Sequence, residues 1–275
     1  MATATVYRRL SGTHPELVEH AWVVTDQEGE CELLLPDGRG LLQVTDGPPG
    51  TRTDARTGAT TRDEDGVRGL GTRPVVRRGG AGGVRLGLQL HPLALARLGV
   101  TGAVDTWLPL TDVLPAGVVA AARTALLAGD ATAAARALED GLAVRAAAVP
   151  VDDEVDRLAE ALALADERRG LVTVTDLARA LEVTVSDVHR WSVRHLGAPP
   201  AAYLAAVRFT GFVREAVGPG PVAPADVVAA LRWYARAGQA PREVERFTGL
   251  TPVELHRLEE RVVALTGEPP AVAAG

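Results

Sequence analysis

The sequence lacks lysine, asparagine and isoleucine altogether, and it contains a single cysteine, Cys31. One cysteine excludes a disulfide framework and any zinc site built on several thiolates. No segment approaches the roughly 18 uninterrupted apolar residues that a membrane-spanning helix needs. The segment from Met1 to Leu10 also holds no long apolar run before a small-residue cleavage site, which would mark a secretion signal. We therefore expect a cytoplasmic protein with no membrane partner.

Because lysine is absent, arginine supplies all 29 strongly basic side chains, against 35 acidic ones and a net charge of −6. This total argues against a strongly basic nucleic-acid binder, although totals hide how charge is distributed. The window from Val188 to Arg214 contains four arginines, two histidines and no acid. Guanidinium groups are planar cations with several donors, suited to phosphate and guanine. That window is the one notable cationic segment of the sequence.

The sequence shows no arrangement of side chains suited to catalysis. Its three serines lie outside any Gly-x-Ser-x-Gly turn, and its six histidines show no metal-ligand spacing. The glycine-rich run at residues 79–83 is not followed by the Lys-Ser/Thr pair of a phosphate-binding loop. We therefore predict that the chain is not an enzyme and has no metal site and no cofactor.

The chain has a β-rich first part and a helical second part. Short aliphatic runs between Gly, Pro and Asp clusters predict strands at residues 21–25, 31–35, 41–44 and 84–90. Polar residues 46–66 are expected to form an exposed, mobile loop, with a solvated acidic run at 63–65. Ala- and Leu-rich sequence predicts helices from Ala116 to about Ala148, and nearly everything after Asp153 has a helical pattern.

Residues 173–197 predict two short helices joined by a tight turn. Thr173 and Thr184 each stand three residues before an aspartate, Asp176 or Asp187, which is the spacing of a capping box. The second helix is expected to bury Val188, Trp191 and Leu196 and to end at Gly197. This is the helix-turn-helix pattern, in which the second helix lies in the DNA major groove.

The second helix would expose a short row of side chains to DNA: Val185, Ser186, His189, Arg190 and Val193. Arg190 has the donors for a bidentate contact to guanine, and Ser186 and His189 can add hydrogen bonds to base edges. Arg194 and Arg208 are expected to contact phosphates or to pair within the chain, because most protein–DNA hydrogen bonds go to the backbone.

The run RWSVRHLGAPPAAYL at residues 190–204, followed by Arg208, resembles the AraC/XylS family of bacterial transcription regulators. A second match to that family is EVERFTGLTP at residues 243–252. The first half resembles an uncharacterised β-rich domain often fused before AraC-type DNA-binding domains. The resemblance spans nearly the whole chain, and it implies tandem helix-turn-helix units and a sensor domain for a small molecule.

The chain departs from the family pattern at residues 233–239, where WYARAGQ replaces the usual Gly-Tyr-x-Asp-Gln-x-His run, and at three single positions. Ser192 stands where an aromatic residue is usual, and Pro224 stands where a Ser or Thr cap is usual. Pro241 falls at or inside the second reading helix, and proline is tolerated only in a helix's first turn. That helix is therefore either shortened to begin near Ala240 or partly decayed. Only Arg242 offers strong hydrogen bonding there, so we expect most base readout from the first unit.

These observations predict an α+β chain in three parts. Residues 1–148 form a β-rich sensor or dimerisation domain with connecting helices, and a cupin-like barrel is its expected form. Residues 152–264 form an AraC-type domain of two helix-turn-helix units, and residues 265–275 form a flexible tail.

The sequence thus predicts a transcription regulator that binds double-stranded promoter or operator DNA, mainly through its first helix-turn-helix. Its predicted DNA-binding residues are Ser186, His189, Arg190, Arg194, Arg208 and Arg242. An unidentified small-molecule effector, RNA polymerase and a second copy of the chain are further candidate partners.

The alternative is a non-DNA interaction or ligand-binding protein on a regulator scaffold whose DNA-reading surface has decayed. The net acidic C-terminal half and Pro241 suggest it. Convergence of Arg190, Arg194 and Arg208 on one exposed face would favour the regulator. Pairing of these arginines with acids such as Asp176, Glu182 or Glu215 would favour the alternative.

Overall fold

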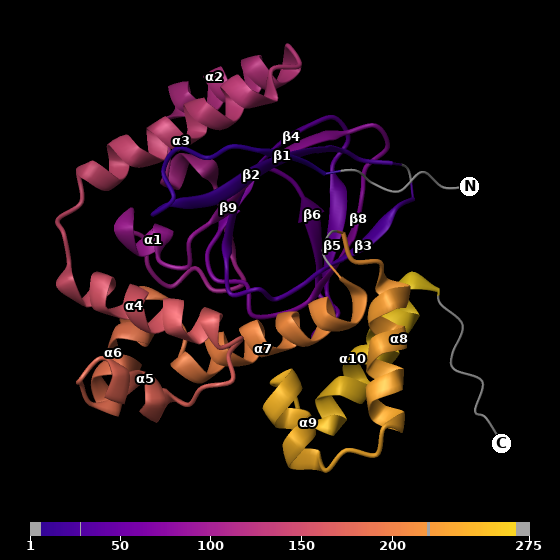
Figure 1. Ribbon diagram of the computed structural model, residues 1–275. Coiled ribbons are helices and arrows are strands. Elements are labelled where there is room, and N and C mark those ends of the chain that lie inside the picture. Colours follow the sequence, from indigo (N-terminus) through magenta and orange to yellow (C-terminus); the bar gives the residue numbers. More distant parts are fainter. Residues whose placement is uncertain (1–6, 28, 219–220, 268–275) are drawn as a thin grey trace.

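The computed structural model describes residues 7–27, 29–218 and 221–267. Its first half contains the strands and its second half is helical, which confirms the predicted α+β class (Figure 1). None of the helices in the described ranges combines the length and the apolar composition that crossing a bilayer requires.

The strands form two antiparallel sheets that face one another in a barrel-like arrangement, the form expected of a cupin-like domain (Figure 1). The first sheet has the order β1 (Arg8–Leu10), β2 (Val18–Thr25), β9 (Val84–Leu90), β4 (Gly40–Asp46), β7 (Gly66–Arg68) and β10 (Trp107–Leu108). The second has the order β3 (Cys31–Leu34), β8 (Val75–Arg78), β5 (Gly50–Asp54) and β6 (Thr60–Asp63).

The side chains along these strands alternate in the opposite sense to an ordinary β-sandwich. Successive residues of a strand point to opposite faces of its sheet. On β9, Leu86 and Leu88 point outward into an apolar core. Arg85 of the same strand points inward and pairs with Asp26 and Glu32. On β8, Val76 packs outward and Arg77 points inward. Charge therefore lies between the sheets, and aliphatic side chains lie outside them.

Ion pairs fill the space between the sheets. Arg77 pairs with Asp26 and Asp63, and its Nη1 lies 3.4 Å from Glu32. Arg85 pairs with Asp26 and with Glu32, each at 3.0 Å. All five of these charged side chains are buried. Since a buried charge is tolerated only when it is paired and hydrogen-bonded, the pairing between sheets fixes how they face one another.

The exposed loop expected at residues 46–66 is wrong, because this segment contains strands β5 and β6. Asp63, expected to be solvated, is buried and accepts a hydrogen bond of 2.9 Å from Gln43. Arg52 of β5 pairs with Asp63 at 2.5 Å and lies 3.6 Å from the centre of the Trp107 ring. The segment has a polar composition because its inward side chains are charged, and a search for apolar alternation cannot detect such strands.

Helices cover the outer face of the first sheet. They are α1 (Ala94–Arg97), the short 3-10 turn Leu110–Asp112, α2 (Ala116–Leu127) and α3 (Ala131–Ala147). Helix α2 packs on β4 and α3 packs on β2 and β9, which buries Leu42, Leu88 and Leu138 in one core. The helices expected between Ala116 and about Ala148 are thus confirmed.

Seven further helices make up the rest of the chain that the structure describes. They are α4 (Asp153–Glu167), α5 (Val174–Ala180), α6 (Val185–His195), α7 (Pro200–Val217), α8 (Pro224–Arg236), α9 (Pro241–Thr248) and α10 (Pro252–Thr266). Helix α10 continues to Thr266, so the first residues of the expected tail are helical. Residues 268–275 of that tail lie outside the described residues.

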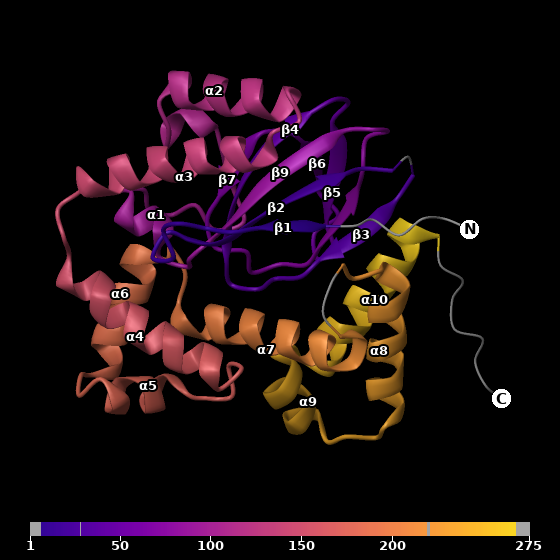
Figure 2. The same cartoon turned by 45° about the horizontal axis from the view of Figure 1, so that its top comes forward.

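The second sheet is covered by helices of the second half, with α7 running along the β-rich part (Figure 2). Leu33 and Val76 share one core with Phe209 of α7 and Val228 of α8. The backbone N–H of Leu33 also donates to the carbonyl of Val222 at 3.0 Å. The predicted boundary at residues 149–151 therefore separates the β-rich part from the helical part along the chain. In space, the two parts share one hydrophobic core.

Arg39, in the turn before β4, ties the two halves together. Its guanidinium pairs with Glu19 at 2.7 Å and with Asp166 of α4 at 2.6 Å, and it donates to the Tyr203 hydroxyl of α7 at 2.8 Å. The Tyr203 ring is buried against Gly38, where a Cβ atom would lie 2.8 Å from the ring. The tyrosine of the family-like motif is thus used for docking the two halves.

We expect Arg77→Met to lower the free energy of unfolding by about 3–5 kcal/mol, because it leaves Asp26 and Asp63 as buried charges without a full partner. Arg78→Met is the matched control, since Arg78 is the next residue and is exposed. Its loss should stay below about 1 kcal/mol. Urea unfolding followed by circular dichroism measures both, and equal losses would contradict a stabilising role for the interior ion pairs.

Candidate nucleic-acid interface

The first helix-turn-helix, α5 and α6, begins each helix with a reciprocal cap. The Thr184 side chain accepts from the Asp187 N–H at 3.1 Å, and the Asp187 carboxylate accepts from the Thr184 N–H at 3.1 Å. Thr173 and Asp176 form the same capping box at the start of α5. Both predicted caps are confirmed, and they fix where α6 begins whatever it binds.

The buried side of α6 is also as predicted. Val188, Trp191 and Leu196 are buried, and Gly197 follows the helix with a φ of +76°, which favours glycine. Ser192, which replaces the usual aromatic residue, is buried and donates its hydroxyl proton to the Ala198 carbonyl at 2.7 Å. A polar side chain is accepted at this core position because the following turn supplies its hydrogen-bond partner.

The opposite side of α6 faces solvent. Val185 and Val193 are each 46% exposed, and Ser186, His189 and Arg190 are also exposed. These are the five side chains that the helical pattern placed on the reading face. They form a short surface with one cation, two hydrogen-bonding groups and two aliphatic groups, which together can contact base edges and a thymine methyl group.

Acidic residues near the start of α4, together with one acid of α6 itself, pair with the arginines of α6. Arg190 lies 2.8 Å from Asp187 and 3.7 Å from Glu154. Arg194 lies 3.0 Å from Glu154 and 3.7 Å from Asp152. The arginine side chains are still 58% and 61% exposed, so these pairs are weak and open to competition. Pairing occurs, but with acids other than Asp176, Glu182 and Glu215.

The same acids meet His195, whose Nε2 lies 3.3 Å from Glu154. Burial tends to raise the pKa of Glu154, but the His195 hydrogen bond and the charges of Arg194 and Arg190 lower it overall. Ligand atoms of Asp152, Glu154 and His195 lie within 4.8 Å of one another, a spacing that can hold a cation. The guanidinium groups already on these carboxylates make the cluster an ion-pair network.

Arg208 does not join this surface. It lies on α7 and is half-buried, and its Nε donates to the Leu204 carbonyl at 3.3 Å. Burial lowers the pKa of Arg208, and the charge of Glu245 opposes that shift. Because Arg208 lies apart from Arg190 and Arg194, the three arginines do not converge on one exposed face.

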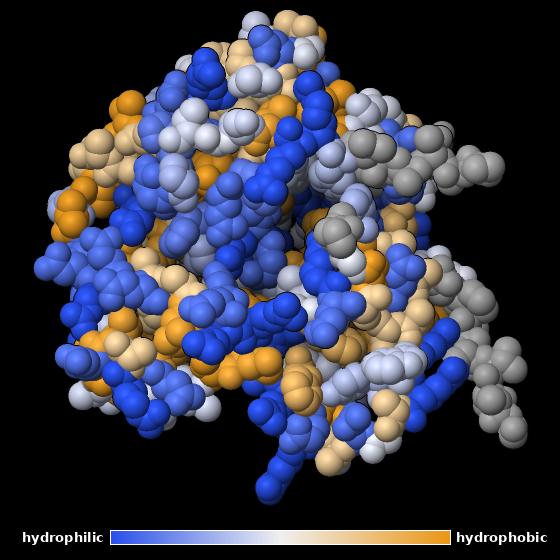
Figure 3. Space-filling view, in the orientation of Figure 1, coloured by the Kyte–Doolittle hydropathy of each residue, from blue (hydrophilic) through white to orange (hydrophobic). Residues whose placement is uncertain are grey.

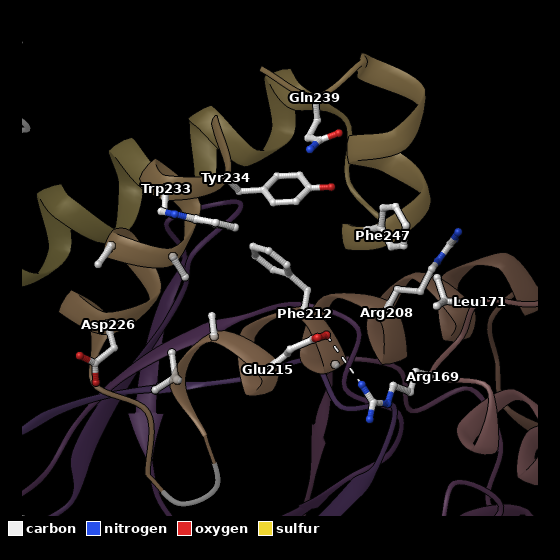
Figure 4. Close-up of a pocket in the computed structure, with 15 residues that line it drawn as sticks. Arg169, Leu171, Arg208, Phe212, Glu215, Asp226, Trp233, Tyr234, Gln239 and Phe247 are labelled. Atoms are coloured by element: carbon white, nitrogen blue, oxygen red, sulfur yellow. Dashed lines mark ion pairs between the residues drawn. The ribbon is translucent and has the colours of Figure 1, made fainter. Parts of the chain in front are cut away.

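Arg208 instead lines a groove of about 900 Å³ between α7 and the second helix-turn-helix. Figure 4 shows Arg208 beside Phe247, with Trp233 and Tyr234 of α8 on the other wall. Arg169 and Glu215 form an ion pair of 3.7 Å at the base of the view. Trp233 and Phe247 are exposed, so this aromatic groove is open to solvent.

The second helix-turn-helix, α8 and α9, has a shortened reading helix. Pro241 is the first residue of α9 and Ala240 precedes it as the cap, so the shortened alternative is correct. Pro224 likewise stands in the first turn of α8, and neither helix has a side-chain cap. Arg242 is exposed in the first turn of α9, and no carboxylate of the described residues lies within ion-pair distance of it.

Sequence reasoning missed the acids that face the reading helix. Glu154 stands 40 residues before Arg194, the arginine of α6 that it meets. The one local signal was Asp152, which caps α4 through the Glu154 N–H at 3.0 Å. A capping residue indicates where a helix starts. It does not indicate that the acids of that first turn contact arginines of another helix.

No family model matches the chain, and no curated protein matches its sequence. Among solved structures the chain is similar to ToxT from Vibrio cholerae O395, with 9% identity, a TM-score of 0.42, and coverage of 86% of this chain and 97% of ToxT. It is also similar to the AraC-like transcriptional activator CuxR, with 14% identity, a TM-score of 0.30, and coverage of 68% and 79%.

A third similar structure is the cupin domain of Cnp3 from Schizosaccharomyces pombe, with 18% identity and a TM-score of 0.26. It covers 36% of this chain and 74% of that domain. The order of elements in this chain, a barrel-like β part before two helix-turn-helix units, is the order that the AraC/XylS resemblance predicts.

We expect Thr184→Ala to lower the free energy of unfolding by about 1 kcal/mol, because it removes the side chain that accepts from the Asp187 N–H. Ser186→Ala, two residues further on the exposed face, should change it by less than about 0.5 kcal/mol. Thermal or urea unfolding distinguishes the two. Similar losses from both substitutions would mean that the cap does not stabilise α6.

Proposed function

We propose that the chain is a sequence-specific, DNA-binding transcription regulator whose helix α6 enters the major groove. The observation that carries this proposal is the exposed face of a doubly capped helix-turn-helix, with Ser186, His189 and Arg190 in one row. Arg190 reads guanine through its two-donor edge, and Ser186 and His189 contact neighbouring base edges.

Phosphate contacts come from arginines outside that row. Arg194 at the end of α6 and Arg242 in the first turn of α9 are exposed and can face the backbone. Arg208 must leave its half-buried position to do so. Helix α7 joins the two units, so α6 and α9 address successive major grooves about 34 Å apart. Neutralised phosphates release counterions, so affinity falls as salt rises.

Binding also has an internal competitor, because Glu154 and Asp187 already hold Arg190 and Arg194. DNA must displace these carboxylates, which reduces net affinity but also penalises contact with a wrong base that cannot replace them. This surface therefore supports a reader of moderate affinity. The ion pairs of Arg190 and Arg194 also favour the alternative function, a regulator scaffold that no longer reads DNA.

The β-rich part is the proposed sensor of a small-molecule effector. Such a ligand acts only if it binds the DNA-competent and incompetent arrangements with different affinity. The core shared by the second sheet, α7 and α8 offers a physical connection between the two parts. A second copy of the chain and RNA polymerase are further proposed partners of the regulator.

Fluorescence anisotropy against DNA from upstream of the chain's own gene tests the proposal. Arg190→Ala should weaken specific binding by about 1–3 kcal/mol, because it removes a bidentate base contact. Arg179→Ala is the control, since Arg179 is exposed on α5 and pairs with Asp176 at 3.1 Å. It should leave affinity nearly unchanged.

Wild-type binding should also weaken between two salt concentrations. Binding that is weak, equal on random DNA and unaffected by Arg190→Ala would reject the regulator and support the decayed scaffold.

We further expect Glu154→Gln to strengthen DNA binding by about two- to fivefold, because it releases Arg190 and Arg194 from a competing carboxylate. Glu160→Gln removes the same charge from an exposed position of the same helix and serves as the control. The gain should shrink as salt rises. An equal gain from both variants would show that only net charge matters, and no gain would show that Glu154 does not compete with DNA.

A further inference from the structure

Three side chains with metal-binding atoms meet where α4 begins and α6 ends. They are Asp152, which caps α4, Glu154 in its first turn, and His195, the last residue of α6. Hydrophilic residues cover the surface around the start of α4 (Figure 3), so a hydrated ion meets a polar surface there. Glu154 and His195 are 41 residues apart in the chain, so the spacing of the histidines in the sequence did not indicate a metal site here.

The spacing of their ligand atoms fits one metal ion. Zn²⁺ binds imidazole nitrogen and carboxylate oxygen at about 2.0–2.1 Å in a tetrahedral arrangement, which puts neighbouring ligand atoms about 3.3 Å apart. The Nε2 atom of His195 lies 3.3 Å from Oε2 of Glu154 and 3.7 Å from Oδ2 of Asp152. Ligand atoms of all three residues lie within 4.8 Å of one another, so small side-chain rotations bring them onto a common centre. A site with three protein ligands leaves a fourth position for water.

Two of the three ligands are held in position by other contacts. Asp152 uses Oδ1 to accept the backbone N–H of Glu154 at 3.0 Å, which leaves Oδ2 facing His195. The His195 side chain is 6% exposed, so packing fixes the orientation of its ring. The Asp152 and Glu154 side chains are half-buried, so an ion from solvent can reach both carboxylates. The ligand set is thus preformed by the fold and open to solvent on one side.

A buried donor beside this cluster has no acceptor. Trp191 is 7% exposed, and its indole Nε1 is buried and forms no hydrogen bond with any described residue. Burial raises the pKa of the Glu154 carboxyl, but His195 and the nearby Trp191 N–H lower it overall, so this N–H points toward the cluster. A buried N–H without an acceptor costs stability. An oxygen added to the cluster, such as a water molecule on a bound ion, would accept from it.

The charges of the cluster also favour an added cation. With the imidazole neutral, three carboxylates face two guanidiniums, which gives a net charge of −1. These charged residues are Asp152, Glu154, Asp187, Arg190 and Arg194. The pairs are weak because the arginine side chains are largely exposed. A divalent ion would change the sign of the local charge, and it has only weakly held guanidiniums to displace.

The ion and Arg194 would compete for the same oxygen atoms. Nη1 of Arg194 lies 3.0 Å from Oε2 of Glu154, and its Nη2 lies 3.7 Å from Oδ2 of Asp152. Those two oxygens are also the ones that face His195. Arg190 instead approaches Oε1 of Glu154, and its closer partner is a different carboxylate of α6. A bound ion must therefore displace Arg194, whereas Arg190 keeps its closer partner.

We propose that Asp152, Glu154 and His195 bind a divalent transition-metal ion such as Zn²⁺, and that the bound ion releases Arg194 for contact with a DNA phosphate. Imidazole together with carboxylate suits ions of this class, whereas Mg²⁺ and Ca²⁺ prefer sites built of oxygen alone. The metal site stands on its own geometry, and only the release of Arg194 toward DNA rests on the proposed function. The ion raises DNA affinity because it frees a cation at the end of α6.

Isothermal titration calorimetry on the full chain without DNA tests the metal site separately from DNA binding. Zinc chloride and magnesium chloride are titrated into metal-free protein at about pH 7.5, where imidazole and carboxylate side chains are ordinarily deprotonated. We expect one Zn²⁺ per chain, bound at least about tenfold more tightly than Mg²⁺, because only Zn²⁺ gains from the imidazole ligand. Equal binding of the two ions, or no zinc binding at submillimolar concentration, would overturn the proposal.

Asp152→Asn removes one ligand but keeps the cap of α4, because asparagine caps helices about as well as aspartate does. It should weaken zinc binding at least about tenfold, and His195→Gln should do the same. Asp153→Asn loses the same charge at the next, exposed position and should change zinc affinity by less than about twofold. Zinc binding that neither ligand variant weakens would place the ion elsewhere and overturn the proposed site.

Fluorescence anisotropy with the same upstream DNA tests the release of Arg194. Zinc should strengthen DNA binding by the wild-type chain about two- to fivefold, and it should have no effect on Asp152→Asn. Zinc that binds the protein but leaves the DNA affinity of the wild-type chain unchanged would overturn the release of Arg194. If the chain binds no DNA at all, the proposed function and the release of Arg194 toward DNA fail together, whereas calorimetry still decides the metal site.

Discussion

The buried charges between the two sheets are the constraint on which the rest of the structure depends. Arg77 and Arg85 point into the space between the sheets, where they pair with carboxylates. Because successive side chains of a strand point to opposite faces, the residues between the charged ones point outward. Those outward residues are leucines and valines, which cannot face water as a continuous surface. Each sheet therefore needs a helical layer, and the chain supplies one from α2 and α3 and the other from α7 to α10.

This arrangement makes the helix-turn-helix part a structural component of the β-rich part. The helices that join and support the two units also cover the second sheet, so the two parts share one core. Arg39 adds a polar connection, since it contacts β2, α4 and α7 at once. A change inside the β-rich part can therefore alter the relative position of α6 and α9, which a flexible linker between independent domains would not transmit.

The ion pairs of the two parts differ in their exposure to solvent. On α6, weak and exposed pairs with Glu154 and Asp187 leave Arg190 and Arg194 able to exchange partners at low cost. Between the sheets the ion pairs are buried, so the loss of one partner leaves an uncompensated charge and destabilises the fold. The ion pairs on α6 can therefore exchange partners, whereas those between the sheets are fixed parts of the fold.

Interactions that span three or four residues were determined by the sequence alone. The capping boxes of α5 and α6, the buried position of Trp191 and the exposed row around Arg190 all follow from local backbone geometry. Only the tertiary structure decided which acids meet Arg190 and Arg194, that residues 50–54 and 60–63 form strands, and that α9 begins at Pro241. These depend on contacts between residues far apart in the chain. The sequence does not reveal whether a charged side chain faces water or pairs with a residue of a distant strand.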